Sequence, residues 1–404
     1  MSTSTASVSF NPRVEAMQPS ATLAMSARAK ELKRAGKPVI SLSAGEPDFG
    51  TPEPIAEAGI QAIREGFTKY TQNSGMPELR EAIAAKLQRE NGLSYAPDQI
   101  VCSSGAKQSL ALTINALLRP GDELLIPAPY WVSYPEMARM AGGEPAIVQT
   151  SVDNGYKLTP TELEDAITPR TRILVHCSPS NPTGAVYTRE ELEALAEVLQ
   201  RHPQVFVVSD EIYEYVTYGT PHVAFASLPG MKERTITVNG FSKGYSMTGW
   251  RLGYLAGPKV IASMAAKIQG QFTSAPCSIS QKAGIAALTM DQEPVRKMVR
   301  AFEERRDLVV SRLSAIDGVT CPVPQGAFYA FPDVSAFHGT ATPDGRPINS
   351  SQELCLHLLE DHFVATVHGE AFGMPSGMRL SYATGMDDLK AALDRVETAL
   401  HQLS

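Results

Sequence analysis

One lysine stands in a segment with few other charges, and its surroundings raise the question of whether it does chemistry. Lys243 lies between Ser242 and Gly244 in the segment FSKGYSMTGWRLGY, and Arg251 follows eight positions later. A solvated surface lysine needs no special neighbours, whereas small neighbours let another molecule approach the amine. An amine is a nucleophile only when it is neutral, and burial or a nearby cation lowers its pKa from about 10.4 toward that state. Lys243 is therefore a candidate for covalent chemistry.

Further polar groups follow segments that are predicted to be strands. The segment CSSGAKQSL leaves a strand and enters a helix, so the backbone N–H groups of Ser104, Gly105 and Ala106 could hold a phosphate, although many such turns are rich in glycine. Asn181 lies in SPSNPTG, and Asp210 and Tyr213 lie in VVSDEIYEY. An acid at a strand end is often only a helix cap. Ligands of open α/β sheets, however, bind beyond the carboxyl ends of the strands.

Together these groups match the needs of one cofactor. Pyridoxal 5′-phosphate requires a lysine for its aldehyde, a carboxylate for its ring nitrogen, donors to its phenolic oxygen and a seat for its phosphate. The sequence therefore favours a covalently engaged Lys243 over a solvated one.

The elements that must position these groups alternate between helix and strand. Helices are predicted at 76–91, 106–118, 132–142 and 189–202, and strands at 99–104, 122–129, 172–177 and 205–213. Residues 173–177 and 205–208 are nearly continuous apolar runs, as expected for strands covered on both faces. This alternation predicts an α/β fold with a parallel sheet. After about residue 290 a long charged helix, strands and two further helices predict a smaller α+β domain.

Composition excludes several other classes of protein. The chain has 404 residues, a net charge of −7 and no long basic run, so we expect no binding of nucleic acid. No apolar stretch is long enough to span a membrane, and the first residues resemble no secretory signal. Five scattered cysteines without a C-x-x-C pattern favour a cytoplasmic location and argue against disulfides or zinc. His357, His362 and His368 are spaced wrongly for metal ligands on one helix face, so no metal site is expected.

Nine segments, in order along nearly the whole chain, give the sequence a resemblance to a known family. They are PSAT (19–22), SAGEPDF (43–49), KYTQNSGMPELREA (69–82), GAKQ (105–108), PYWVSYPEM (129–137), SPSNPTGAVY (178–187), VSDEIYE (208–214), VNGFSKGYSMTGWRLGY (238–254) and RLSYA (379–383). The sequence resembles class I aminotransferases of fold type I, in the bacterial aspartate aminotransferase branch that includes aspartate/prephenate enzymes. The resemblance implies a mostly parallel sheet between helices, with an arm and part of the small domain at 1–48, a large domain at 49–292 and a small domain at 293–404.

The resemblance also implies roles for individual residues. Lys243 would bind the cofactor aldehyde and move the substrate proton, and Asp210 would pair with the ring nitrogen. The remaining cofactor contacts would come from Tyr213 and Asn181 at the phenolic oxygen, Trp131 on the ring, Gly105, Ala106 and Arg251 at the phosphate, and Tyr70 reaching that phosphate from the second subunit of a homodimer. Arg379, Gly45, Asn181 and Trp131 would bind the substrate. Cis bonds are expected at Ala128–Pro129 and Asn181–Pro182.

Two departures from the family pattern bear on the substrate, and a third bears on the phosphate seat. The stretch 268–281 has no arginine for the distal carboxylate, so Lys107 is expected to bind it with support from Ser20 and Thr22; the alternative is a plain lysine at a helix start. Gln18 stands where dual-specificity members tend to have lysine, which argues against prephenate activity without removing it. Gly240 stands where some relatives have a phosphate-binding serine, so fewer phosphate contacts are expected.

The resulting hypothesis is transamination of L-aspartate with 2-oxoglutarate by a ping-pong mechanism, with amino acids and 2-oxo acids as substrates. The alternatives with the same cofactor are prephenate, aromatic or alanine/kynurenine-type transamination, and a β-elimination side reaction. An aminotransferase-like part of a transcription regulator would need a DNA-binding region before a core that begins by about residue 14. A nicotinamide-dependent dehydrogenase would need a G-x-G-x-x-G motif after a strand, and the sequence has none.

Overall fold

The centre of the molecule is a seven-stranded sheet. The computed structural model describes residues 9–19 and 21–404. The strands are β2 (Ile100–Ser103), β3 (Glu123–Ala128), β4 (Glu144–Gln149), β5 (Thr171–Cys177), β6 (Phe206–Asp210), β7 (Thr235–Gly240) and β8 (Gly253–Ala256), in the order β2-β8-β7-β6-β5-β3-β4. Every pair is parallel except that β8 runs antiparallel to both β2 and β7. The predicted mostly parallel α/β sheet is confirmed.

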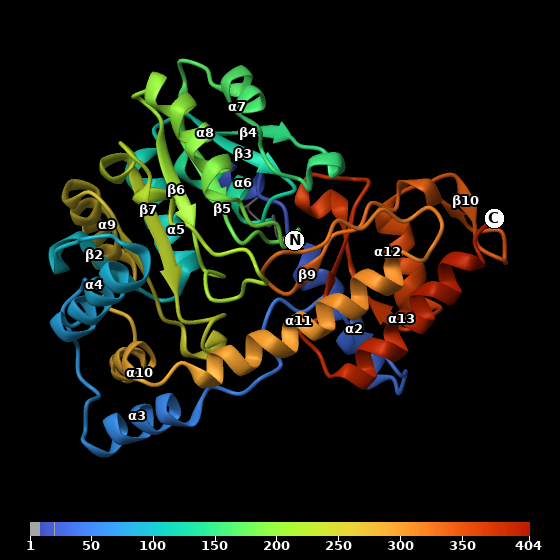
Figure 1. Cartoon of the computed structure of the whole chain (residues 1–404), viewed down its shortest axis with the longest axis horizontal. Coiled ribbons are helices and arrows are strands. Elements are labelled where there is room, and N and C mark those ends of the chain that lie inside the picture. Colours follow the sequence, from blue (N-terminus) through green and yellow to red (C-terminus); the bar gives the residue numbers. More distant parts are fainter. Residues whose placement is uncertain (1–8, 20) are drawn as a thin grey trace, which may run out of the picture.

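Helices cover both faces of this sheet, as alternating side chains require. Leu124 and Ile126 of β3 pack in the cluster that contains α5 and α6, whereas Leu125 between them packs with α8. The helices of this part are α3 (Glu53–Arg64), α4 (Pro77–Asn91), α5 (Ala106–Leu117), α6 (Tyr134–Ala141), α7 (Pro160–Ala166), α8 (Arg189–Arg201), α9 (Lys259–Phe272) and α10 (Ser278–Thr289). Figure 1 shows α7 and α8 above the strands, with α4 and α10 below them on the left.

Local sequence signals explain several helix boundaries. α4 has Pro77 in its first turn, and it ends at Gly92, whose φ of 67° is the left-handed conformation that glycine adopts without strain. α8 begins with a capping box in which the Thr188 side chain accepts from the Glu191 N–H. These signals placed both helices correctly to within one residue.

A second, smaller part lies at one end of the large sheet (Figure 1). Its elements are α11 (Glu293–Leu313), β9 (Tyr329–Ala330), β10 (Thr340–Ala341), β11 (Pro347–Ile348), α12 (Ser351–Glu360), β12 (Val364–Ala365), β13 (Val367–His368), β14 (Met378–Ser381) and α13 (Met386–His401). β13, β14 and β9 form an antiparallel sheet, and β10 and β11 form a hairpin. Residues 318–334, which follow the long charged helix and belong to the strands expected after residue 290, form only β9 and isolated bridges, because their prolines interrupt the ladder.

The beginning of the chain completes this second part. After α1 (Pro12–Glu15), α2 (Ala21–Arg34) packs against β12 and β13 and forms an ion pair with α12 through Arg28 and Glu360. β1 (Ile40–Ser41) pairs in parallel with β12 through Ile40 and Val364. The chain then returns to the large part through α3. The domain limits at residues 48 and 292 remain a prediction.

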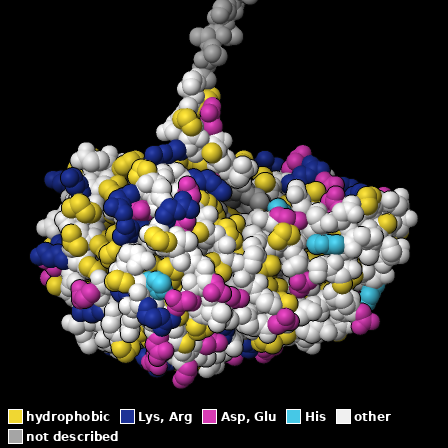
Figure 2. Space-filling model, turned by 90° about the horizontal axis from the view of Figure 1, so that it is seen from above, with side chains coloured by type: hydrophobic (Ala, Val, Ile, Leu, Met, Phe, Trp, Pro, Cys, Tyr) yellow, Lys and Arg dark blue, Asp and Glu magenta, His cyan; other side chains and the backbone are white. Residues whose placement is uncertain are grey.

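The surface carries charges of both signs. Figure 2 shows Lys and Arg side chains interspersed with Asp and Glu across one face, without a patch of a single sign covering it. Among the helices of the described residues, none combines the length and the apolar character needed to cross a membrane.

Candidate functional site

A cavity of about 330 Å³ opens beyond the carboxyl ends of β5 and β6, between the two parts of the molecule. Most of the predicted site residues line it together, although they come from distant segments of the chain. They are Thr22, Gly45, Ala106, Lys107, Trp131, Asn181, Asp210, Tyr213, Lys243, Arg251 and Arg379.

Lys243 lies in the turn after β7, and its amine points into this cavity. The Nζ atom donates a hydrogen bond to the carbonyl of Gly45. Burial lowers the pKa of Lys243 to about 8, with Glu46 acting in the opposite direction and the positive charges of Arg251 and Arg379 adding to the lowering. A substantial share of these amines is therefore neutral near physiological pH, as a nucleophile requires.

Asp210, at the end of β6, supplies a carboxylate to the same cavity. Its side chain is buried, and its oxygens accept hydrogen bonds from the Tyr134 hydroxyl at 2.7 Å and from the Ile212 N–H at 3.3 Å. Burial raises the pKa of Asp210 to about 6. Within the described residues no salt bridge engages this buried carboxylate, so it is suited to pair with a protonated ring nitrogen.

Arg379, on β14, is a guanidinium held in place for an anion. It donates to the Asn181 Oδ1 atom at 2.9 Å and to the Ser43 carbonyl at 2.8 Å. Its buried Nε has no hydrogen-bond partner within the described residues, and burial lowers the pKa of the group. A buried guanidinium N–H without an acceptor destabilises the folded protein unless a ligand accepts its hydrogen bond. The site therefore fits a carboxylate.

Tyr213 and Tyr329 form a pair beside Arg379. Their hydroxyls lie 2.8 Å apart, and the Arg379 guanidinium stacks 4.6 Å from the centre of the Tyr329 ring. Tyr213 and Asn181 were predicted to contact a phenolic oxygen, and both reach the cavity. Tyr329 was missed, because it comes from the short strand β9, which only tertiary packing brings to Tyr213.

The start of α5 and Arg251 form the predicted seat for a phosphate. Gly105 has a φ of 89°, and a Cβ atom there would lie 2.8 Å from the Arg251 Nη2 atom. Arg251 donates to the Thr248 carbonyl at 2.9 Å. The Ser104 N–H, which the sequence suggested as a phosphate donor, instead donates to the Gln108 side chain at 2.5 Å, and the Gly105 N–H donates to the Ser103 carbonyl.

Lys107 and Trp131 lie together in the same cavity. The Lys107 amine is 4.8 Å from the centre of the Trp131 ring, and burial, with a contribution from Arg251, lowers its pKa. Thr22 also lines the cavity. Ser20 lies outside the described residues. The Gln18 N–H donates to Glu136 at 3.4 Å.

Tyr70 lies away from this cavity. It is 98% exposed and does not line the cavity, so within one chain it contributes nothing to the site. Large exposed apolar side chains also occur on α3 and α9 and include Ile63, Val260 and Phe272.

Three cis peptide bonds shape the loops around the site. The predicted cis bonds at Ala128–Pro129 and Asn181–Pro182 are confirmed, and Ser178–Pro179 is a third that the sequence did not indicate.

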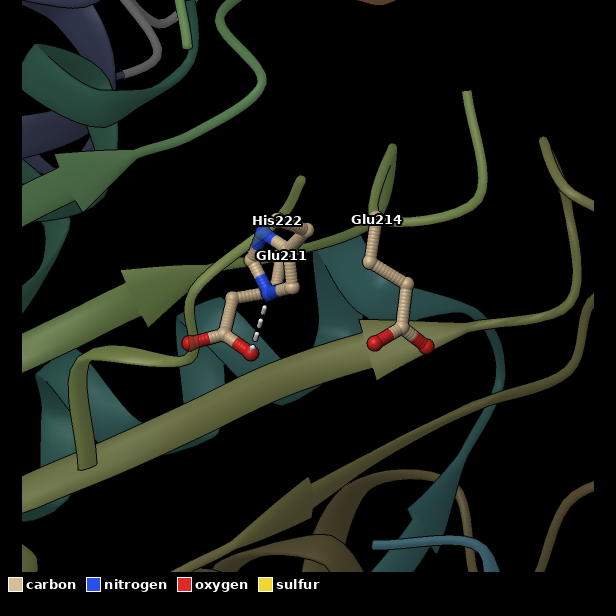
Figure 3. Close-up of side chains that lie close together, drawn as sticks. All are labelled: Glu211, Glu214 and His222. Carbon is tan, nitrogen blue, oxygen red and sulfur yellow. Dashed lines mark hydrogen bonds and ion pairs between the residues drawn. The ribbon is translucent and has the colours of Figure 1, made fainter. Parts of the chain in front are cut away.

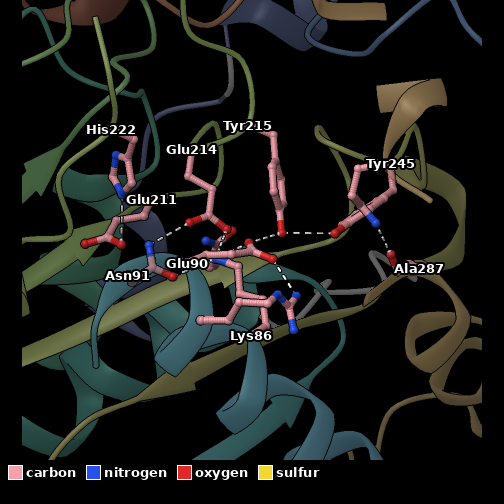
Figure 4. Close-up of polar contacts among 12 residues, drawn as sticks. Lys86, Glu90, Asn91, Glu211, Glu214, Tyr215, His222, Tyr245 and Ala287 are labelled. Atoms are coloured by element: carbon pink, nitrogen blue, oxygen red, sulfur yellow. Dashed lines mark hydrogen bonds and ion pairs between the residues drawn. The ribbon is translucent and has the colours of Figure 1, made fainter. Parts of the chain in front are cut away.

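A buried polar network lies behind the site residues (Figure 4). Lys86 of α4 is 1% exposed and is paired with Glu214, which also accepts from Asn91 at 3.1 Å. Although burial opposes ionisation, the charge of Lys86 holds the pKa of Glu214 below its usual range. Tyr215 joins the network by donating to Glu90 at 2.8 Å.

The members of this network are chain neighbours of the site residues. Glu211 follows Asp210, Glu214 follows Tyr213, and Tyr245 lies two positions after Lys243 and donates to the Tyr215 hydroxyl at 3.0 Å. Glu211, Glu214 and His222 lie close enough to share a cation (Figure 3). Both carboxylates already have protein donors: Glu211 accepts from Ser209 at 2.8 Å and from His222 at 3.2 Å, and Glu214 accepts from Lys86. The network therefore braces the backbone of the site.

The arrangement defines a class of enzyme site in which a lysine, a carboxylate and two arginines face one cavity at the end of a parallel sheet. Comparison with known proteins identifies the class. The model of the family described as aminotransferase class I and II matches residues 37–396. The chain belongs to this family, and the predicted resemblance is confirmed.

Individual relatives are similar over nearly the whole chain. An aspartate aminotransferase of Pinus pinaster is 53% identical over 97% of this chain and 81% of the relative. An aspartate/prephenate aminotransferase of Cereibacter sphaeroides is 49% identical over 96% of this chain and 98% of the relative.

Solved structures share the fold and confirm the predicted fold type I. The crystal structure of the aspartate aminotransferase of Rhizobium meliloti aligns with a TM-score of 0.95 at 47% identity, covering 98% of this chain and 100% of that one. The Thermus thermophilus aspartate aminotransferase, solved with maleate, aligns with a TM-score of 0.90 at 43% identity, covering 97% and 100%.

Proposed function

We propose that the protein transaminates L-aspartate with 2-oxoglutarate, giving oxaloacetate and L-glutamate, with pyridoxal 5′-phosphate as its cofactor. One observation carries the proposal: the Lys243 amine, the Asp210 carboxylate and the unsatisfied guanidinium of Arg379 line a single cavity. Relatives named aspartate aminotransferase, similar along nearly the full chain, support the choice of substrate.

When bound, the cofactor supplies an electron sink for the electrons released at the substrate's α-carbon. Lys243 would hold the cofactor aldehyde through its amine, and the same amine would accept and return the proton of the substrate's α-carbon. Asp210 stays ionised and holds the proton on the ring nitrogen. Tyr213 and Asn181 contact the phenolic oxygen, and Trp131 covers the ring. Arg251, with the backbone N–H of Ala106, would hold the phosphate, and the Gly105 N–H would join them only by leaving the Ser103 carbonyl.

The substrate is oriented by its two carboxylates. Arg379 clamps the α-carboxylate with two parallel hydrogen bonds, a geometry that lysine does not reproduce. Asn181 and the backbone of Gly45 complete that end of the site. Lys107 binds the distal carboxylate, with Thr22 and Ser20 in support. Maleate in the Thermus thermophilus structure is likewise a dicarboxylate.

We further propose that the working form is a homodimer in the cytoplasm. Tyr70 is almost fully exposed in one chain, and further exposed apolar side chains occur on α3 and α9. Such a surface favours burial against a second copy, from which Tyr70 reaches the phosphate seat of its partner.

Prephenate is the second candidate substrate. It is favoured by the names of two relatives, the aspartate/prephenate enzyme of Cereibacter sphaeroides and a bifunctional enzyme of Petunia hybrida that is 53% identical. Single-turnover spectra with a panel of amino acids separate the candidates. Failure of aspartate to convert the bound aldehyde form to the amine form, with success of an aromatic donor, would refute the substrate assignment.

Covalent attachment is tested directly. The protein is loaded with pyridoxal phosphate, treated with borohydride and analysed by peptide mass mapping, with Lys243→Ala as the control. The expected result is modification at Lys243 together with a visible absorption band that changes on addition of aspartate. An unmodified Lys243 would refute the proposed chemistry.

A further inference from the structure

A tyrosine that the proposed mechanism does not use makes a direct contact with its carboxylate. Tyr134 is the first residue of α6, and its side chain is 2% exposed. Its hydroxyl donates a hydrogen bond of 2.7 Å to the Asp210 Oδ2 atom. The other carboxylate oxygen, Oδ1, accepts from the Ile212 N–H at 3.3 Å. Each oxygen of Asp210 therefore has one donor from the protein.

The tyrosine is held rigidly in this position. Its ring meets the Trp131 ring edge to face, with the centres 5.3 Å apart and an angle of 80°. Such an arrangement is favourable for aromatic rings and fixes the direction of the hydroxyl. Trp131 itself lines the cavity, so the ring that is proposed to cover the cofactor also supports the donor to Asp210.

Burial keeps the Tyr134 hydroxyl protonated and makes ionisation of Asp210 less favourable. Burial raises the pKa of Tyr134 well above its usual value, so its hydroxyl keeps its proton at neutral pH. Burial also raises the pKa of Asp210 to about 6, while the bond from Tyr134 acts in the opposite direction. Glu211, Lys243 and the Cys177 thiol also face this carboxyl, Glu211 raising its pKa and Lys243 lowering it.

We propose that Tyr134 is a positioning residue that keeps Asp210 ionised and aims its carboxylate at the ring nitrogen of the cofactor. This inference rests on the proposed function, because Asp210 needs its charge only if it pairs with a protonated ring. A fixed donor holds a buried carboxylate in its charged form, and loss of that donor makes protonation easier.

The affinity of the cofactor-free protein for pyridoxal phosphate tests the inference. Tyr134→Phe is expected to weaken binding about ten- to a hundredfold, the range for a lost hydrogen bond to a charged group. The matched control is Tyr156→Phe, because Tyr156 is also buried but its hydroxyl has no partner among the described residues. The control is expected to bind like the unaltered protein. Equal affinities of the two variants would overturn the inference.

A double-mutant cycle separates positioning from a general loss of structure. If Tyr134 acts through Asp210, Tyr134→Phe weakens binding strongly in the unaltered protein but hardly at all in an Asp210→Asn background. An equal loss in both backgrounds would assign Tyr134 a packing role only. If Tyr134→Phe does not fold, Tyr134→His, which can still donate, replaces it; a loss as large as that of Asp210→Asn would then refute the inference.

An infrared titration of the cofactor-free protein is independent of the proposed function. The carboxyl band of Asp210, identified by its absence in Asp210→Asn, is expected to titrate at a higher pH in Tyr134→Phe than in the unaltered protein. An unchanged titration would contradict the inference. If the unaltered protein binds no pyridoxal phosphate, the proposed function fails, while this titration still decides whether Tyr134 controls Asp210.

Discussion

Replacement of Lys107 by alanine gives the sharpest test of substrate choice. Lys107 lines the cavity one residue after Ala106 of the predicted phosphate seat, and its amine rests 4.8 Å from the centre of the Trp131 ring. A hydrogen bond from this amine to a distal carboxylate is worth about 1.5–3 kcal/mol. To form it, the amine gives up a contact with the ring that is worth about 0.5–1 kcal/mol. The net contribution is therefore about 1–2 kcal/mol.

This energy predicts a selective loss. The kcat/KM for aspartate should fall about 5- to 30-fold in Lys107→Ala, because 1.4 kcal/mol corresponds to about a factor of ten. The value for a monocarboxylic donor such as alanine should stay within about a factor of two, because no distal carboxylate is present. The assay is the loss of the aldehyde absorption band in single-turnover reactions with each amino acid.

A second lysine in the chain provides the control. Lys282 also lies over an aromatic ring, 4.7 Å from the centre of Phe67, but it does not line the cavity. Lys282→Ala should leave both reactions unchanged. Equal losses for aspartate and alanine in Lys107→Ala would show that the lysine only supports the helix start, and the assigned role would be wrong.

Three further predictions concern the network, the nucleophile and the clamp. Lys86→Met should lower the free energy of unfolding by about 3–5 kcal/mol in urea titrations, because it leaves the buried charge of Glu214 unpaired, and adding Glu214→Leu should restore most of the loss. Because burial lowers the pKa of Lys243 to about 8, capture of pyridoxal phosphate should speed up as the pH rises and level off above that value; a rate independent of pH would contradict this. Arg379→Lys should weaken every amino acid substrate about tenfold or more, since lysine cannot make the paired hydrogen bonds; a loss confined to dicarboxylic donors would refute the clamp.

The parts of the site that stand at strand ends were predictable from sequence. Asp210 and Asn181 follow apolar runs that indicate buried strands. In a parallel sheet the carboxyl ends of such strands lie at one edge, and ligands bind there. The resemblance then added Arg379 and Trp131, which no pattern of spacing connects with Lys243. These residues do line one cavity in the structure.

The parts that depend on tertiary packing were not predictable. β8 lies between β2 and β7 and runs in the opposite direction to both. In the sequence this segment directly continues the one that contains Lys243, and nothing in it indicates an antiparallel strand. Tyr134 and Tyr329 are ordinary aromatic residues by sequence, and only the folded chain brings their hydroxyls to Asp210 and Tyr213. The Lys86–Glu214 pair joins residues 128 positions apart, so no local pattern indicates it.

The pairing of β1 with β12 has a consequence for synthesis on the ribosome. Ile40 pairs with Val364, so the first strand has no partner until most of the chain has been made. At about 5–20 residues per second, this wait lasts on the order of tens of seconds. During that time β1, which lies between Thr22 and Gly45 in the sequence, has no partner strand. The wall of the cavity that these two residues form is therefore completed only after β12 has left the ribosome.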